Sequence, residues 1–173
     1  KDQAVTDSFV AGYHAAEHRF RFAAWCASTA ASRSSKCRFS VNTGADLLKD
    51  KNLRFIALGP HWLPSPPLFD KQHEVWRELL IQQATKLPEG KIKGKFTHGV
   101  AAKLINCYLK ALFIQDLAAR PFVPYPQNEY DTNDLDIRLR AVHPPIDRLL
   151  LKELKKQNVG GHARYWRELH DAG

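Results

Sequence analysis

Two short stretches of the sequence have the residue types and spacing of metal ligands. His14, Glu17 and His18 follow the order His-x-x-Glu-His, in which two imidazoles four residues apart on a helix can bind zinc. A second stretch is acidic and offers the oxygen ligands of a divalent cation, from Glu129, Asp131, Asp134 and Asp136. The first stretch has no clear third ligand, and the second lacks the turn glycine and terminal glutamate of a calcium loop. The sequence therefore predicts solvated or core-edge histidines in the first stretch and a solvated loop in the second, with no metal site and no cofactor.

Charge is spread unevenly along the chain. The 173 residues include 26 Lys and Arg against 18 Asp and Glu, a formal net charge of +8. From Gly90 to Gln115 there is no acid, but there are five lysines, Lys91, Lys93, Lys95, Lys103 and Lys110. A second basic stretch runs from Arg148 to Arg167, whereas acids collect between Asp116 and Asp136. This distribution favours a nucleic-acid partner and a surface that is basic on one side.

Composition places the chain among ordinary globular proteins, since 44% of the residues are hydrophobic and 25% are charged. No apolar run approaches the roughly 20 residues of a membrane helix, and the first residues form no apolar signal segment. Cys26, Cys37 and Cys107 are odd in number and widely spaced, which predicts three buried thiols rather than disulfides. We therefore expect a cytoplasmic or nucleoid-associated monomer that has no membrane partner.

The elements that must position any site are predicted to be helices. Three are clear: Phe9 to Ala31, Asp70 (as the cap) to Lys86, and an amphipathic stretch from Val100 to Leu112 with apolar residues at helical spacing. Shorter helices are expected after a cap at Asn42 or Thr43, over Leu135–Val142, from Pro145, and over His162–His170. No alternating strand of useful length appears. The prediction is an all-α domain of two helical lobes over residues 1–173.

Two segments carry a resemblance to a known family. Residues 97–103 read THGVAAK between a basic connection and an apolar helix, and residues 142–148 read VHPPIDR. The first resembles the hairpin of the helix-hairpin-helix DNA glycosylase superfamily (endonuclease III-like), roughly Leu-Pro-Gly-Val-Gly-x-Lys. The second resembles that family's Pro-Val-Asp-Thr-His-Val. The resemblance implies a helix-hairpin-helix at about residues 86–113 and a loop insertion at about residues 116–141.

The resemblance also implies a function and its residues. Lys103 falls at the family's Schiff-base lysine, and Asp147 falls at its catalytic aspartate. Hairpin N–H groups would hold phosphates of double-stranded DNA while the target base is extruded from the stack. The implied DNA contacts are Lys91, Lys93, Lys95, His98, Gly99, Val100, Ala101 and Arg148. The expected protein is a base-excision glycosylase, with lyase activity if Lys103 forms an imine.

Two other functions stay open. A non-catalytic nucleic-acid-binding protein would keep the hairpin without the chemistry. Arg138 and His143 have the Arg-x4-His spacing that resembles HEPN-type ribonucleases, in which the pair positions and protonates an RNA phosphate, although Pro144-Pro145 interrupts a helix there. The aromatic and basic run from Arg164 to Arg167 has the residue types that stack on bases, but Trp166 is more often a packing residue.

Overall fold

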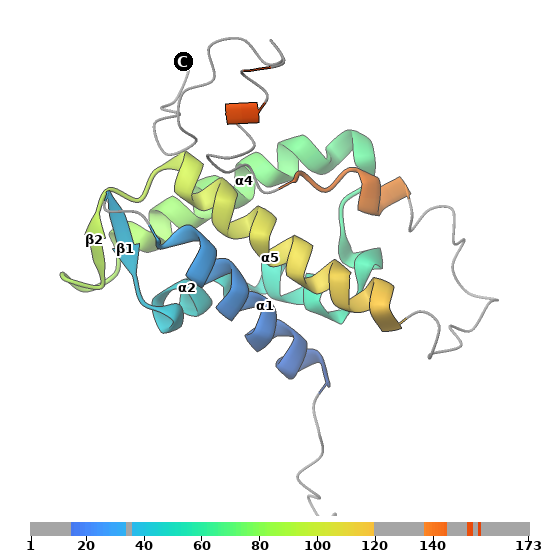
Figure 1. Cartoon of the computed structure of the whole chain (residues 1–173), viewed down its shortest axis with the longest axis horizontal. Helices are drawn as coiled ribbons and strands as arrows, with labels where there is room; N and C mark the ends of the chain where they lie inside the picture. The colour runs from blue at the N-terminus through green and yellow to red at the C-terminus, as the bar shows by residue number, and fades with distance from the viewer. Residues whose placement is uncertain (1–14, 34–35, 120–136, 145–151, 154–155, 157–173) are drawn as a thin grey trace, which may run out of the picture.

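The computed structural model describes residues 15–33, 36–119, 137–144, 152–153 and 156. In chain order the elements are α1 (Ala15–Ala31), β1 (Cys37–Phe39), α2 (Val41–Leu48), α3 (Lys51–Arg54), the 3-10 helices η1 (Phe55–Leu58) and η2 (Pro60–Trp62), α4 (Pro66–Thr85), β2 (Ile92–Gly94) and α5 (His98–Ala119). Helix α5 runs through the middle, with α1 and α4 packed on it and the two strands at one end (Figure 1). The predicted mainly helical class is confirmed.

Helix α5 provides the centre of the core, because its apolar side chains pack against both α1 and α4. Seven of these side chains are at most 1% exposed: Val100, Ala101, Leu104, Ile105, Tyr108, Leu109 and Leu112. Helix α1 meets this core with small residues that are fully buried, Ala23, Ala24, Ala27 and Ala31. Small side chains allow two helices to approach closely. The amphipathic period predicted for Val100–Leu112 is thus confirmed.

Two helices begin earlier than the sequence suggested. Helix α4 starts at Pro66 after an extended cap residue, Ser65, so the prediction that Asp70 caps it is wrong. Proline fits the first turn because the N–H groups there have no partner within the helix. Helix α2 is capped by Ser40, whose Oγ accepts from the Thr43 N–H at 3.0 Å, and not by Asn42 or Thr43.

The small sheet was not predicted. Strands β1 and β2 pair antiparallel, with Cys37 opposite Gly94, Arg38 opposite Lys93 and Phe39 opposite Ile92. Three residues are too few to show an alternating pattern, and the pairing depends on a partner far away in the sequence. Gly94 has φ +86, and a Cβ there would lie 2.0 Å from the Lys36 carbonyl oxygen, so only glycine fits.

The connection between α4 and α5 also differs from a simple helical hairpin. It contains β2, and the residues predicted as the turn, Gly99 and Val100, lie in the first turn of α5. Of the segment predicted as a loop insertion, residues 116–119 belong to α5, and residues 137–140 are helical, within the short helix predicted over Leu135–Val142. No helix in the described part of the chain has both the length and the apolar character to cross a membrane.

Several predictions fall wholly or partly on residues outside the described ranges. These include the start of the first helix, most of the insertion with its acidic cluster, the helices from Pro145 and over His162–His170, and Arg164–Arg167. Of the three cysteines, Cys37 is buried as predicted, but Cys26 and Cys107 are partly exposed. Burial raises the pKa of the Cys37 thiol to about 11.

Candidate functional site

A cluster of polar side chains lies where α4, α5 and residues 137–144 meet. His73 on α4 and Asn106 on α5 are each 4% exposed, and His73 Nε2 lies 2.8 Å from Asn106 Oδ1. Asn106 Nδ2 donates to the Pro144 carbonyl at 3.4 Å. Because that carbonyl only accepts, the amide oxygen of Asn106 faces His73, and His73 must donate from Nε2. Asn106 therefore joins both helices to the 137–144 segment.

A second contact holds the same segment to α4. His143 Nε2 lies 2.7 Å from Asp70 Oδ1, with the side chains 40% and 86% exposed. The His143 ring is 4.9 Å from the His73 ring and meets the Phe69 ring edge-on at 5.2 Å. A carboxylate bound to one imidazole nitrogen fixes the orientation of the ring. The dipeptide His143–Pro144 is thus held by its side chain to α4 and by its carbonyl to α5.

The two histidines have different environments. Burial lowers the pKa of His73 to about 4; the Asn106 hydrogen bond and Asp70 oppose this effect, while His143 and Arg77 add to it. His73 is therefore neutral at pH 7 and acts as a hydrogen-bond donor within the core. His143 is half-buried, and its ring reaches the surface beside Asp70.

Lys103 lies on α5, one turn before Asn106, and is half-buried. Helices α4 and α5 run antiparallel, since His73 meets Asn106 while Glu78 meets His98 at 3.3 Å. Lys103 therefore lies on α5 between these two contacts. The Nε of Arg77 is buried and has no hydrogen-bond partner among the described residues.

The remaining residues predicted to contact DNA occupy different settings. Lys91, Lys93 and Lys95 are exposed on and beside β2, and His98 is paired with Glu78. Gly99, Val100 and Ala101 are buried at the start of α5. The Val100 N–H donates to Thr97 Oγ1 and the Ala101 N–H to the Thr97 carbonyl, so a phosphate would share these donors with the helix cap. Asp147 and Arg148 lie outside the described residues.

Arg138 and His143 bond to different groups. Arg138 Nη1 donates to the Leu63 carbonyl, whereas His143 binds Asp70. An Arg–His pair that acts on one RNA phosphate needs both side chains directed at that phosphate. These contacts thus give the ribonuclease interpretation no direct support.

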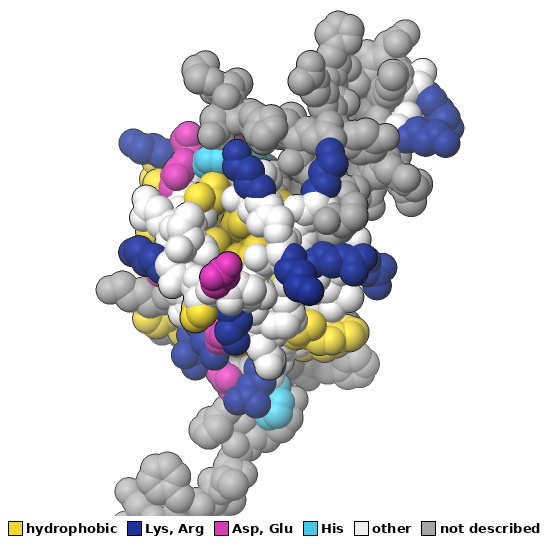
Figure 2. Space-filling view, turned by 90° about the vertical axis from the view of Figure 1, so that its left-hand side faces the viewer, with side chains coloured by type: hydrophobic (Ala, Val, Ile, Leu, Met, Phe, Trp, Pro, Cys, Tyr) yellow, Lys and Arg dark blue, Asp and Glu magenta, His cyan; other side chains and the backbone are white. Residues whose placement is uncertain are grey.

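The outer face of the small sheet carries basic side chains from both strands. Figure 2 views the molecule from the side of this sheet and shows Lys and Arg side chains spread over the face, with a few acidic ones between them. This face is thus basic, with acidic side chains mixed among the cations. Arg38 and Lys93 are both exposed and stand directly opposite each other.

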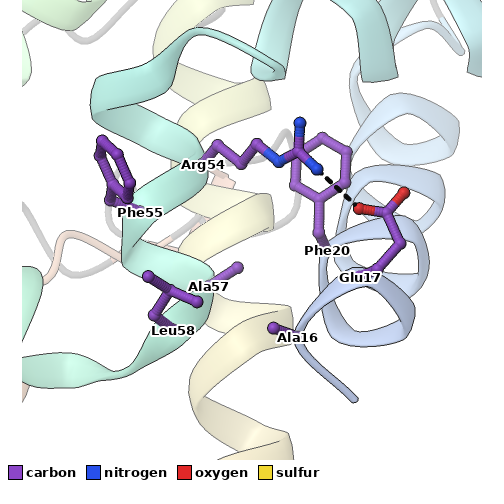
Figure 3. A pocket seen from close by; sticks show the side chains of 7 residues that line it. All are labelled: Ala16, Glu17, Phe20, Arg54, Phe55, Ala57 and Leu58. Carbon is purple, nitrogen blue, oxygen red and sulfur yellow. Dashed lines mark hydrogen bonds and ion pairs between the residues drawn. The ribbon is translucent and has the colours of Figure 1, made fainter. Parts of the chain in front are cut away.

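A separate cavity of about 490 Å³ lies between α1 and the α3–η1 segment (Figure 3). Its walls are largely apolar, and an ion pair crosses its rim: Arg54 donates to Glu17 at 3.0 Å and stacks 5.8 Å above the Phe20 ring. Glu17 also binds Arg21 at 2.8 Å, and this hydrogen bond lowers the pKa of its carboxyl group. Glu17 of the zinc-like stretch is thus held by two arginines. In the described ranges no three His, Cys, Asp or Glu side chains gather as metal ligands.

No protein-family model, curated protein or solved structure matches the chain. The glycosylase resemblance therefore stays a prediction. The sequence analysis did not identify Asp70, His73 or Asn106 as site residues, although the positions of His73 and Asn106 within apolar helix faces could have indicated them. His73 shares a helix face with buried Phe69, Trp76 and Leu80, and Asn106 lies within the apolar pattern of α5. A polar residue at a core position needs a partner, which marks both as members of a network.

Proposed function

We propose that this protein binds DNA and acts as a base-excision glycosylase with lyase activity, in which Lys103 is the nucleophile and Asp147 the catalytic carboxylate. The observation that carries this proposal is the hydrogen bond between Asn106 and the Pro144 carbonyl. Asn106 follows Lys103 by three residues, and Pro144 precedes Asp147 by three. Three residues span at most about 11 Å. The contact brings Pro144, which leads to Asp147, against the helix that carries Lys103, and this favours a common site for the two residues.

The chemistry requires an amine and a carboxylate at one sugar. The unprotonated amine of Lys103 attacks C1′ of the extruded nucleotide, and the bond from C1′ to the base breaks with its electron pair leaving on the base. The carboxylate of Asp147 stabilises the positive charge that develops on the sugar. As the sugar ring opens at the bond from C1′ to O4′, the two amine protons pass to the departed base and to O4′, and an imine remains between Lys103 Nζ and C1′.

The surroundings of Lys103 suit a DNA substrate. Helix α4, which packs against α5, adds the cation of Arg77. The lysines of the β2 segment are exposed immediately before α5 and add positive charge at the end of the helix from which Lys103 projects. In this proposal α4, the β2 connection and α5 take the part of the family's helix-hairpin-helix.

Borohydride trapping on duplex DNA with an abasic site tests the nucleophile. Borohydride reduces an imine to a stable amine, so the wild-type protein should become covalently attached to the DNA. Lys103→Ala should form no adduct, whereas Lys110→Ala, an exposed lysine on the same helix, should form as much as wild type.

The result also separates the other two functions. Wild-type protein that binds DNA but yields no adduct would overturn the lyase and leave a non-catalytic binding protein. Cleavage of RNA that is lost in both Arg138→Ala and His143→Ala would instead support the ribonuclease.

A further inference from the structure

We propose that the outer face of the β1–β2 sheet is a phosphate-binding surface for the DNA backbone, built from Lys36, Arg38, Lys91, Lys93 and Lys95. This inference rests on the proposed DNA binding and assigns it to a surface. It combines cations from two segments that are distant in the sequence, and Lys36 and Arg38 were not among the DNA contacts that the sequence predicted.

The register places these cations on one face. Arg38 stands opposite Lys93, and the Lys95 N–H donates to the Lys36 carbonyl at 3.3 Å, which continues the antiparallel pairing by one position. Residues directly opposite in an antiparallel pair point to the same side of a sheet. Successive residues of a strand alternate between faces, so Lys91, Lys93 and Lys95 share a side.

The opposite face of the sheet is apolar and closed. Cys37 is 1% exposed and Phe39 is 8% exposed, while Arg38 between them is exposed. The Phe39 ring packs 5.8 Å from the Phe96 ring, which continues the inward side of the β2 segment. The sheet is therefore anchored to the core through one face, and the basic face is fixed toward solvent.

Cross-strand pairs of like charge are costly for a free protein. Side chains directly opposite have Cβ atoms about 5 Å apart, and like charges at that separation destabilise a sheet. Neither β1 nor β2 contains an acid, so the cross-strand pair of Arg38 and Lys93 has no opposite charge within the sheet. A polyanion with closely spaced charges removes this repulsion when it binds. The duplex backbone, with one charge per about 1.7 Å of helix axis, is such a polyanion.

Substitution of one member of a like-charged pair should change stability and DNA affinity in opposite directions. Lys93→Glu places an acid opposite Arg38, so the urea concentration at the midpoint of unfolding should stay equal or rise. DNA affinity should fall, because the change removes one cation and adds an anion. Misfolding lowers both quantities and cannot produce this combination.

Salt dependence measures how many phosphates the surface contacts. Each neutralised phosphate contributes about 0.9 to the slope of log affinity against log salt concentration. We expect the double variant Arg38→Ala and Lys93→Ala to lower the magnitude of the slope by about 2, measured by fluorescence anisotropy with a duplex. The matched control is the double variant Lys71→Ala and Lys110→Ala, which removes two exposed lysines outside the sheet and should keep the wild-type slope.

Two outcomes would overturn the inference. One is a slope that falls equally in the control and the sheet variant, since the cations of the sheet would then have no special part. The other is stronger binding through the same residues to vesicles of anionic lipid than to DNA. The trapping experiment reports separately on Lys103. If wild type forms the adduct but the sheet variant keeps the wild-type salt slope, only this inference is contradicted. If the sheet variant has a reduced slope but wild type forms no adduct, only the proposed chemistry is contradicted.

Discussion

Acid should destabilise the protein through His73, by an amount that follows from its burial. In the folded protein the pKa of His73 is held at about 4, against 6.5 for a solvated imidazole. Between these pH values the unfolded chain takes up a proton that the folded protein does not, so the free energy of unfolding falls as the pH falls. One pH unit is worth about 1.4 kcal/mol, which gives a loss of about 3 kcal/mol near pH 4 and none above about pH 7.

Urea unfolding at several pH values between 4 and 7 measures this loss when wild type is compared with His73→Gln. Glutamine keeps an N–H donor for Asn106 Oδ1 but takes up no proton. Every other titrating group is common to the two proteins, so the difference between their curves isolates His73. The two free energies should converge by about 3 kcal/mol from pH 7 to pH 4, because only wild type loses this contribution. Parallel curves would refute the assignment of His73 as a buried neutral imidazole.

Two further substitutions test the sheet and the 137–144 segment. Gly94→Ala should lower the free energy of unfolding in urea by about 1–3 kcal/mol, because the φ of Gly94 is positive and the new Cβ would meet the Lys36 carbonyl. Gly90 also has a positive φ but lies in open space, so Gly90→Ala should lower it less. Equal losses in the two variants would contradict the close contact at Gly94. His143→Ala removes the Asp70 contact beside the proposed site, and we expect single-turnover base excision to fall at least about tenfold, by 1.4 kcal/mol in the barrier, with DNA affinity kept. Unchanged excision would show that this contact does not position the site.

The sequence predicted best where one physical signal dominates. The apolar period of Val100–Leu112 determines a buried face almost by itself, and every residue of that pattern is buried in α5. The C-terminal end of α4 at Lys86 was also predicted, since Pro88 and Gly90 follow it closely. Such local signals need no knowledge of the partner element.

The features that were missed depend on partners far away in the sequence. Strands β1 and β2 are each too short to be recognised alone, and they form because each supplies the hydrogen bonds of the other. His73 and Asn106 are separated by 33 positions, and neither residue type predicts the other. Their polar side chains at core positions showed that partners must exist, but only the packing of α4 on α5 shows which ones.

The small sheet also has a consequence for the order in which the protein assembles. Its paired residues lie roughly 55 positions apart, and the chain between them contains α2, α3 and α4, so their pairing closes a long loop. Helices α4 and α5 are neighbours in sequence and can associate first, whereas a long-range pairing carries a greater entropic cost. The basic face therefore exists only in a chain that has completed this closure. A partly folded chain would hold its lysines and arginine on separate, uncoordinated segments.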